Sequence, residues 1–195
     1  VVLYSVDFHD IERLQHSGCW DEAGAYLADA ARALAAAGAH FLVLCTNTMH
    51  KVAPAIEAAA SIPLLHIADP TADAVKQAGI RRVGLLGTRF TMEEDFYRGR
   101  LESRHAIHVI VPNEEDRDHV HRIIYHELCL GIVREPSRSA YRGVIDRLRQ
   151  RGAEGIILGC TEIGMLVSPS DSPVPIFDTT RLHAASAVDW ALGER

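Results

Sequence analysis

An internal repeat constrains the fold of this chain more than any other feature of its sequence. A Gly-Ala pair, a mostly apolar segment and a Cys-Thr pair occur in this order at residues 38–46 and again at residues 152–161. Each copy is followed by a proline that begins a second apolar segment, Pro63 in the first and Pro175 in the second. Chance agreement at so many points is uncommon, so we expect two related halves, each with a Cys-Thr pair at the end of a buried strand.

Short apolar segments alternate with longer helical ones along the whole chain. The predicted strands are Val1–Val6, His40–Leu44, Pro63–Ile67, Arg82–Leu86, Ile107–Val111, Gly155–Leu158 and Val174–Phe177. The predicted helices are Asp21–Ala37, Lys51–Ala60, Thr71–Ala78, Thr91–Glu102, Glu114–Leu130, Ser137–Arg151, Glu162–Leu166 and Thr179–Leu192. This alternation predicts an α/β fold with mostly parallel sheets.

The domain boundaries follow from the second part of the repeat. The strand before Thr179 matches the strand before Thr71, where the chain is expected to cross to the other half. We therefore expect a first α/β domain of residues 1–78 plus 179–195 and a second of residues 79–178.

Composition excludes several classes of function. The net charge of −6 offers no basic surface for nucleic acid, and no apolar run is long enough to cross a bilayer. The start of the sequence lacks the charged flank of a signal peptide, and the four cysteines form no CxxC pair. We therefore expect reduced thiols in a cytoplasmic protein. Only Lys51 and Lys76 could form the Schiff base of pyridoxal phosphate, and we expect no cofactor.

The repeated cysteines, Cys45 and Cys160, are the candidate catalytic groups. A thiol at the carboxyl end of a parallel strand faces the start of the next helix, whose dipole and free N–H groups are expected to lower its pKa. Two halves related by an approximate two-fold axis would place these thiols on opposite sides of one cleft. One thiolate could then remove an α-proton while the other thiol protonates the opposite face. The neighbouring side chains expected to bind an amino acid are Thr46, Asn47, Thr48, Thr161 and Glu162.

Other reactive residue types have simpler interpretations. Cys19 and Cys129 are expected to be small buried hydrophobic residues. His119 and His126 share a helix face, but His121 points elsewhere and no cysteine or carboxylate completes a zinc set, so no metal site is expected. Thr46–Thr48 could also serve only as a helix cap.

Several motifs resemble those of the aspartate/glutamate racemase family, and the resemblance covers essentially the whole chain. It is strongest at CTNTMHK (residues 45–51) and GCTEI (159–163), and it extends through LGTRFTM (86–92), DFY (95–97) and FDTT (177–180). The bacterial branch of aspartate/glutamate or broad-specificity racemases looks closest. The resemblance implies two pseudo-symmetric Rossmann-like domains with the active site in the cleft between them, neither pyridoxal phosphate nor metal, and frequently a homodimer.

Motif matching places individual residues in the roles that the family implies. Cys45 and Cys160 take the catalytic positions, and Gln15, in the loop after the first strand, matches a position that contacts the substrate side chain. The positions that line the substrate cleft fall on Thr46, Asn47, Thr48, Thr161 and Glu162.

The chain departs from the family in two respects. Aspartate-specific members carry an arginine where Gln15 stands and a further lysine in the second domain, for which we find no candidate. Strict aspartate specificity therefore does not follow.

Family members also open with a strand and a Gly-rich stretch of the type IGLIGGMSWEST. The chain is therefore expected to lack its opening strand.

We conclude from the sequence that the chain is an isomerase, a cofactor-independent racemase of aspartate, glutamate or related polar amino acids that uses two cysteines. A related two-cysteine enzyme, such as a maleate isomerase or hydantoin racemase, is one alternative. A non-catalytic amino-acid binding protein on the same scaffold is another, although both thiols are present.

Overall fold

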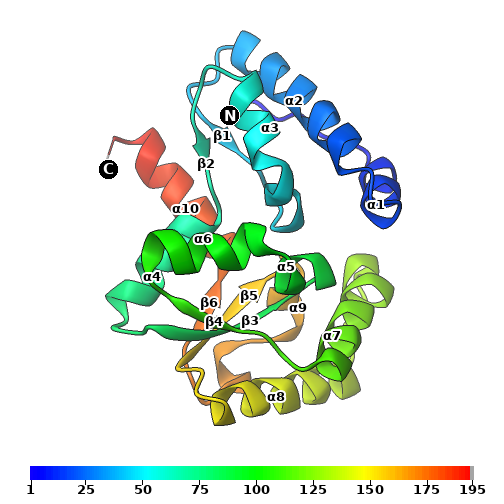
Figure 1. The fold of residues 1–195 in the computed structure, drawn as a ribbon, viewed down its shortest axis with the longest axis vertical. Coiled ribbons are helices and arrows are strands. Elements are labelled where there is room, and N and C mark those ends of the chain that lie inside the picture. The colour runs from blue at the N-terminus through cyan, green and yellow to red at the C-terminus, as the bar shows by residue number, and fades with distance from the viewer. Residues whose placement is uncertain (194–195) are drawn as a thin grey trace. The chain divides into compact units, whose positions relative to one another are not determined.

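The computed structural model describes residues 1–193 and divides into two units. The first unit comprises residues 1–44 and 49–66, and the second comprises residues 45–48 and 67 onward. The helices and strands of each unit are coloured along the chain in Figure 1.

The first unit packs helices on a short parallel sheet. Leu42 pairs with Leu64 and Val43 with Leu65. Its core joins Ile11 and Leu14 to apolar residues of the following helices and strands. The elements are α1 (Phe8–His16), α2 (Trp20–Ala36), β1 (Leu42–Val43), the 3-10 helix η1 (Thr48–Val52, which begins in the second unit), α3 (Ala53–Ala59) and β2 (Leu64–Leu65).

The second unit contains a four-stranded sheet with helices on both faces. The strand order is β4-β3-β5-β6, and all three pairings are parallel. Its strands are β3 (Arg82–Gly87), β4 (His108–Ile110), β5 (Gly155–Gly159) and β6 (Ile176–Asp178). Its helices are α4 (Ala68–Gln77), α5 (Arg89–Glu93), α6 (Asp95–His105), α7 (Glu114–His126), η2 (Leu128–Leu130), α8 (Glu135–Gln150), α9 (Ile163–Leu166), η3 (Pro169–Asp171) and α10 (Thr179–Ala191).

Alternation along the strands separates two cores in this unit. Leu86 and Ile156 face one side of the sheet, where they pack with residues of α7, α8 and α9. Leu85 and Ile157 face the other side and pack with α4 and α6. The two helical layers are visible above and below the sheet in Figure 1. The predicted α/β class with parallel sheets is confirmed.

The two copies of the sequence repeat have the same local backbone. Gly38 and Gly152 both end a helix with positive φ, 88° and 97°, a conformation that glycine adopts without steric cost. In the following strands, the N–H groups of Leu42 and Ile156 donate to Pro63 O and Pro175 O, each at 2.8 Å. Each copy therefore joins a helix end to a parallel strand pair through the same contacts.

Three predicted elements need correction. Val1–Val6 is not a strand: it pairs with no other strand in residues 1–193, and most of it is exposed. The predicted helix at 51–60 is divided into η1 and α3, with Pro54 in the first turn of α3. The predicted helix at 91–102 is interrupted at Glu94, whose extended backbone separates α5 from α6.

Helix α1 was missing from the predicted elements. Asp7 begins it by accepting from the N–H of His9 at 2.9 Å, and its buried face consists of Ile11, Leu14 and Gln15. A helix of nine residues with only two buried apolar side chains has a weak periodic signal.

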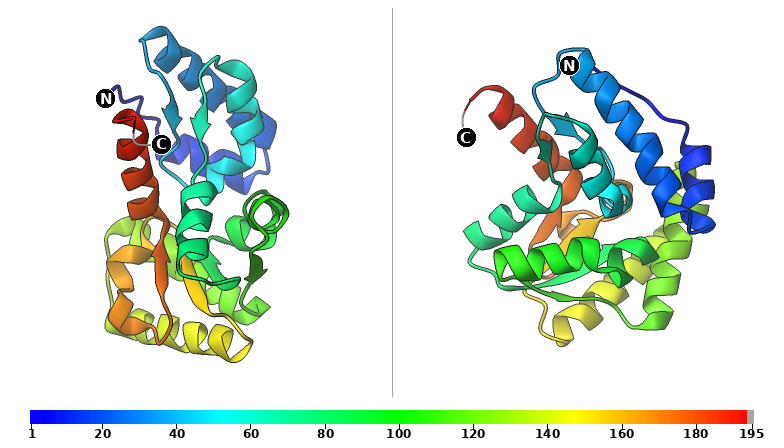
Figure 2. Two further views of the ribbon diagram at one scale, coloured as in Figure 1. Left: turned by 90° about the vertical axis from the view of Figure 1, so that its left-hand side faces the viewer. Right: turned by 45° about the horizontal axis from the view of Figure 1, so that its top comes forward.

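The two units divide the chain differently from the expected domains. Helices α4 and α10 pack on each other, and α10 also contacts β5 and β6 (Figure 2). Both helices therefore belong to the unit with the four-stranded sheet, whereas residues 1–78 plus 179–195 had been expected to form one domain. Within residues 1–193, no helix combines the length and apolarity needed to cross a membrane.

Candidate active site

Three strands of the second unit end side by side at one edge of the sheet. Gly87 of β3 is paired with Gly159 of β5, and Leu158 of β5 with Asp178 of β6. Thr88, Cys160 and Thr179 are the residues that directly follow these strand ends. In open parallel sheets, ligands bind at this carboxyl edge.

Asn47 connects the first Cys-Thr segment to the same edge. Its Nδ2 donates to Thr179 Oγ1 at 3.0 Å, and Thr179 Oγ1 donates to Leu158 O at 2.8 Å. Since the only hydroxyl proton of Thr179 is used by Leu158, the Asn47 amide must present its NH₂ group to Thr179. Residues 132 apart in the sequence are thereby joined close to the end of β5.

A cluster of three buried threonines continues this edge toward β3. Thr48 Oγ1 lies 3.0 Å from Thr88 Oγ1 and 3.4 Å from Thr91 Oγ1, and the latter two are 3.2 Å apart. Thr88 also caps α5, because its side chain accepts from the N–H of Thr91. The cluster holds the segment after Cys45 against the start of α5.

Two glycines allow α5 to approach the strand ends. A Cβ atom on Gly87 would lie 2.8 Å from Gly159 O and 3.1 Å from Thr91 Cβ. A Cβ on Gly159 would lie 2.8 Å from Leu85 Cδ1 and 3.1 Å from Leu86 O. Larger residues at either position would therefore displace backbone or the threonine cluster.

Cys160 lies at this edge with its thiol against a carboxylate. Its Sγ donates to Glu162 Oε2 at 3.0 Å, and Thr161 Oγ1 donates to the same oxygen at 2.7 Å. Burial, followed by the negative charge of Glu162, raises the pKa of the Cys160 thiol well above its usual value. The expectation of a lowered pKa is therefore wrong for Cys160. The Glu162 N–H does favour the thiolate, but desolvation and the Glu162 carboxylate outweigh it.

Cys45 belongs to the same unit and has a different environment. It is exposed, whereas Cys160 is buried, and none of the four cysteines forms a disulfide within the described residues. Thr46 next to it is half-buried. Among the other cysteines, Cys19 is half-buried and Cys129 is exposed, so the expectation of a buried Cys129 is wrong.

Gln15 lies in the first unit. It is part of α1 and not of a loop, as had been expected, and it is 4% exposed. Its Nε2 donates to Met49 Sδ at 3.0 Å. The structure therefore accounts for Gln15 as a packed helix residue, and its contact with a substrate side chain stays a prediction.

Asn47 retains one unused group. The residue is 3% exposed, and its Oδ1 accepts from no donor in the part of the chain that the structure describes. A buried acceptor without a partner is costly, and it gains a hydrogen bond if a ligand donor reaches it.

Thr88, Thr91 and Thr179 were not among the predicted site residues. Each follows a strand end within four residues, and a Gly-Thr or Asp-Thr pair at that position is the signal that could have identified two of them. Their contacts with Thr48 and Asn47 depend on tertiary structure and leave no local pattern.

Among residues 1–193, no group of three or more His, Cys, Asp or Glu side chains is arranged to hold a metal ion.

Comparisons with known proteins agree with the resemblance found in the sequence. Residues 1–187 match the family model described as Asp/Glu/Hydantoin racemase. The chain is 60% identical to a candidate Asp/Glu racemase from Yersinia pestis, whose crystal structure superposes with a TM-score of 0.91 and covers 98% of this chain and 83% of that one. An aspartate racemase homologue from Pyrococcus horikoshii is 33% identical, with a TM-score of 0.83 over the same shares. The broad specificity amino-acid racemase RacX of Bacillus subtilis is 25% identical over 179 residues, 88% of this chain and 74% of RacX.

Proposed function

Since the chain belongs to the Asp/Glu/Hydantoin racemase family, we propose that it racemises a polar amino acid by two-base proton transfer between Cys45 and Cys160. The enzyme is an isomerase of the amino-acid racemase type. The Cys160–Glu162 contact is the observation that best supports the two-thiol mechanism, because a carboxylate beside the buried thiol favours the protonated form that a proton donor requires.

Cys160 is the proton donor in the resting enzyme. Its raised pKa keeps the sulfur protonated at neutral pH, and the carboxylate of Glu162 holds the thiol proton in a defined direction. Cys45, exposed to solvent, then serves as the base in the first direction of reaction. The Cys45 thiolate takes the α-proton, the electron pair of the C–H bond passes to the α-carbon, and the Cys160 proton is delivered to the opposite face. The reverse reaction exchanges the two roles.

The residues around Cys160 suit the two charged groups of an amino acid. The Glu162 carboxylate and the unused Asn47 Oδ1 are acceptors for an ammonium group. The hydroxyls of Thr48 and Thr88 can donate to a carboxylate. An ammonium beside Glu162 would offset its negative charge and so make the Cys160 thiolate easier to form when substrate is bound.

We also propose that the enzyme needs no pyridoxal phosphate. Both lysines have other contacts: Lys51 Nζ lies 3.8 Å above the ring of Trp20, and Lys76 Nζ bonds to His105 Nδ1 at 3.1 Å. Purified protein should show no visible absorbance of an internal Schiff base. A band that borohydride abolishes would contradict this. A cytoplasmic location and a homodimer belong to the same proposal. Light scattering of the purified protein tests the homodimer.

The substrate is an acidic or related polar amino acid, as the names of the similar proteins suggest. The test is α-proton exchange in D₂O, followed by NMR, for both enantiomers of aspartate, glutamate, glutamine and homoserine, with a 5-substituted hydantoin in parallel. We expect exchange accompanied by racemisation of at least one amino acid. Exchange confined to the hydantoin would favour hydantoin racemisation, and binding without exchange would favour a binding protein.

A further inference from the structure

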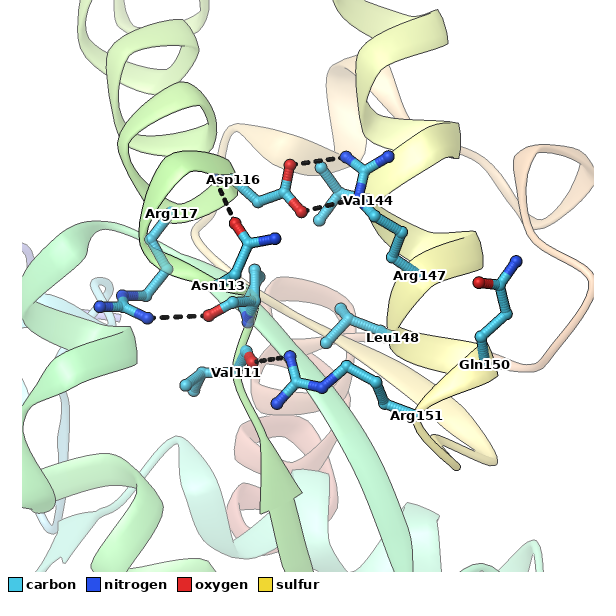
Figure 3. Close-up of a pocket in the computed structure, with 10 residues that line it drawn as sticks. Val111, Asn113, Asp116, Arg117, Val144, Arg147, Leu148, Gln150 and Arg151 are labelled. Carbon is cyan, nitrogen blue, oxygen red and sulfur yellow. Dashed lines mark hydrogen bonds and ion pairs between the residues drawn. The ribbon is translucent and has the colours of Figure 1, made fainter.

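A pocket of about 460 Å³ lies between the start of α7 and the end of α8 (Figure 3). Its apolar side is formed by Val111, Val144 and Leu148. The volume lies in the range of small-molecule sites. Neither Cys45 nor Cys160 lines it, so its role is separate from the racemisation proposed above.

Three arginines and one aspartate contribute the charge of this pocket. Arg147 pairs with Asp116 through two hydrogen bonds, Nε–Oδ2 at 2.7 Å and Nη2–Oδ1 at 2.6 Å. The Asp116 carboxylate is only 13% exposed, and the paired Arg147 guanidinium neutralises its charge. Arg117 and Arg151 are the two arginines of the pocket that do not pair with Asp116.

Backbone carbonyls of the segment after β4 hold both of these guanidinium groups. Arg151 Nη1 donates to Val111 O at 2.7 Å, and Arg117 Nη1 donates to Pro112 O at 2.8 Å (Figure 3). Arg117 also has a partly exposed carboxylate partner, Glu93, at 2.8 Å. Arg151 pairs with no carboxylate in residues 1–193, and its Nε and Nη2 donate to no group there.

We propose that this pocket binds a small organic anion that carries a phosphate or carboxylate group on an apolar body. The unused donors of Arg151 and Arg117 would bind the anionic group, and the apolar body would pack on Val144 and Leu148. A planar guanidinium that is already positioned by a carbonyl loses little side-chain entropy when it binds an oxyanion. The local charge is positive although the whole chain carries −6.

The probe is phenyl phosphate, titrated into ¹⁵N-labelled protein, with inorganic phosphate and phenol as its two halves. We expect saturable binding of phenyl phosphate with a dissociation constant below about 1 mM, weaker binding of phosphate and none of phenol. The Arg151 Nε–H resonance, assigned by its loss in Arg151→Gln, should shift during the titration. Arg151→Gln should weaken binding about tenfold or more, as expected for loss of a charged hydrogen-bond donor.

Two further variants separate binding from structural damage. Arg149 lies on α8 outside the pocket and pairs with Asp146. Arg149→Gln should therefore leave the affinity within about twofold of wild type. Asp116→Asn should increase the affinity, because it removes the carboxylate of the pocket and releases Arg147 to bind the anion. A variant that merely distorted the pocket would lose affinity instead. Absence of phenyl phosphate binding, equal loss in Arg149→Gln, or weaker binding in Asp116→Asn would each overturn the proposal.

Discussion

At the scale of single residues, Cys160 shows how a site can oppose the ionisation that its chemistry later requires. Burial and the adjacent Glu162 both favour the thiol over the thiolate. A protonated thiol is the acid of a two-base mechanism, and Cys45, unlike Cys160, is exposed. The two cysteines of the repeat are therefore chemically different although their sequence contexts are alike.

Replacing either cysteine should abolish racemisation in both directions. Cys45→Ser and Cys160→Ser each leave one working group, and a serine hydroxyl is far too weak an acid to replace a thiol near neutral pH. Each variant should still catalyse elimination from one enantiomer of a β-substituted amino acid, since elimination requires removal of a single α-proton. The measurements are circular dichroism of the amino acid for racemisation and oxo-acid formation for elimination.

Cys19→Ser and Cys129→Ser are the matched controls and should keep turnover close to normal. Substantial racemisation by folded Cys45→Ser or Cys160→Ser would exclude the two-base mechanism. Complete loss in both controls would show instead that the thiols act mainly through stability.

Glu162→Gln should lower the pKa of Cys160. The substitution removes the negative charge that opposes the thiolate but keeps a side chain of the same shape. The titration is the ultraviolet absorbance of the thiolate against pH, in a background where Cys19, Cys45 and Cys129 are serine. Glu154→Gln, just before the opposite end of β5, should leave that pKa unchanged. An unchanged or higher pKa in Glu162→Gln would contradict the assigned cause.

At the scale of elements, local signals predicted much of the fold, and tertiary contacts explain what they missed. The repeat predicted a Cys-Thr pair after a buried strand in each copy, and the helices expected to end at Ala37 and Arg151 end at Ala36 and Gln150. No local pattern could reveal that Asn47 bonds to Thr179, since the two are distant in sequence. The pKa of Cys160 was mispredicted for a related reason: its burial depends on how helices far along the chain cover one face of the sheet.

The contact between η3 and α8 should stabilise the second unit through Asp171. Burial opposes its ionisation, but hydrogen bonds from the backbone and hydroxyl of Ser168 and from Arg142 outweigh this and lower the pKa from 3.8 to about 2. A lowered folded-state pKa contributes stability above the unfolded value near 3.8, and this stability is lost as pH falls toward 2.

Asp171→Asn should therefore reduce the free energy of unfolding by about 1–3 kcal/mol at neutral pH, and the difference from wild type should shrink on acidification. Denaturant unfolding at a series of pH values measures both effects. Asp146→Asn removes an exposed pair on the same helix and should change stability by less than about 0.5 kcal/mol. Equal effects of the two substitutions would refute the role of Asp171.

At the scale of the whole molecule, the distribution of cations predicts relaxed specificity. A neutral amide such as Gln15 hydrogen-bonds a carboxylate, a hydroxyl or another amide without strong preference for charge. Lys51 contacts the ring of Trp20, and Lys76 bonds to His105. We expect kcat/KM for aspartate to exceed that for homoserine or glutamine by less than roughly 10⁴-fold, since a site with a dedicated charged partner discriminates by about that factor or more. Coupled assays on both enantiomers of each amino acid measure these ratios, and the glutamate pair controls for chain length. A larger preference for aspartate would require a cation that binds the side-chain carboxylate. The first residue to substitute would then be Arg181, by glutamine, because it lies in the first turn of α10, two residues after Thr179.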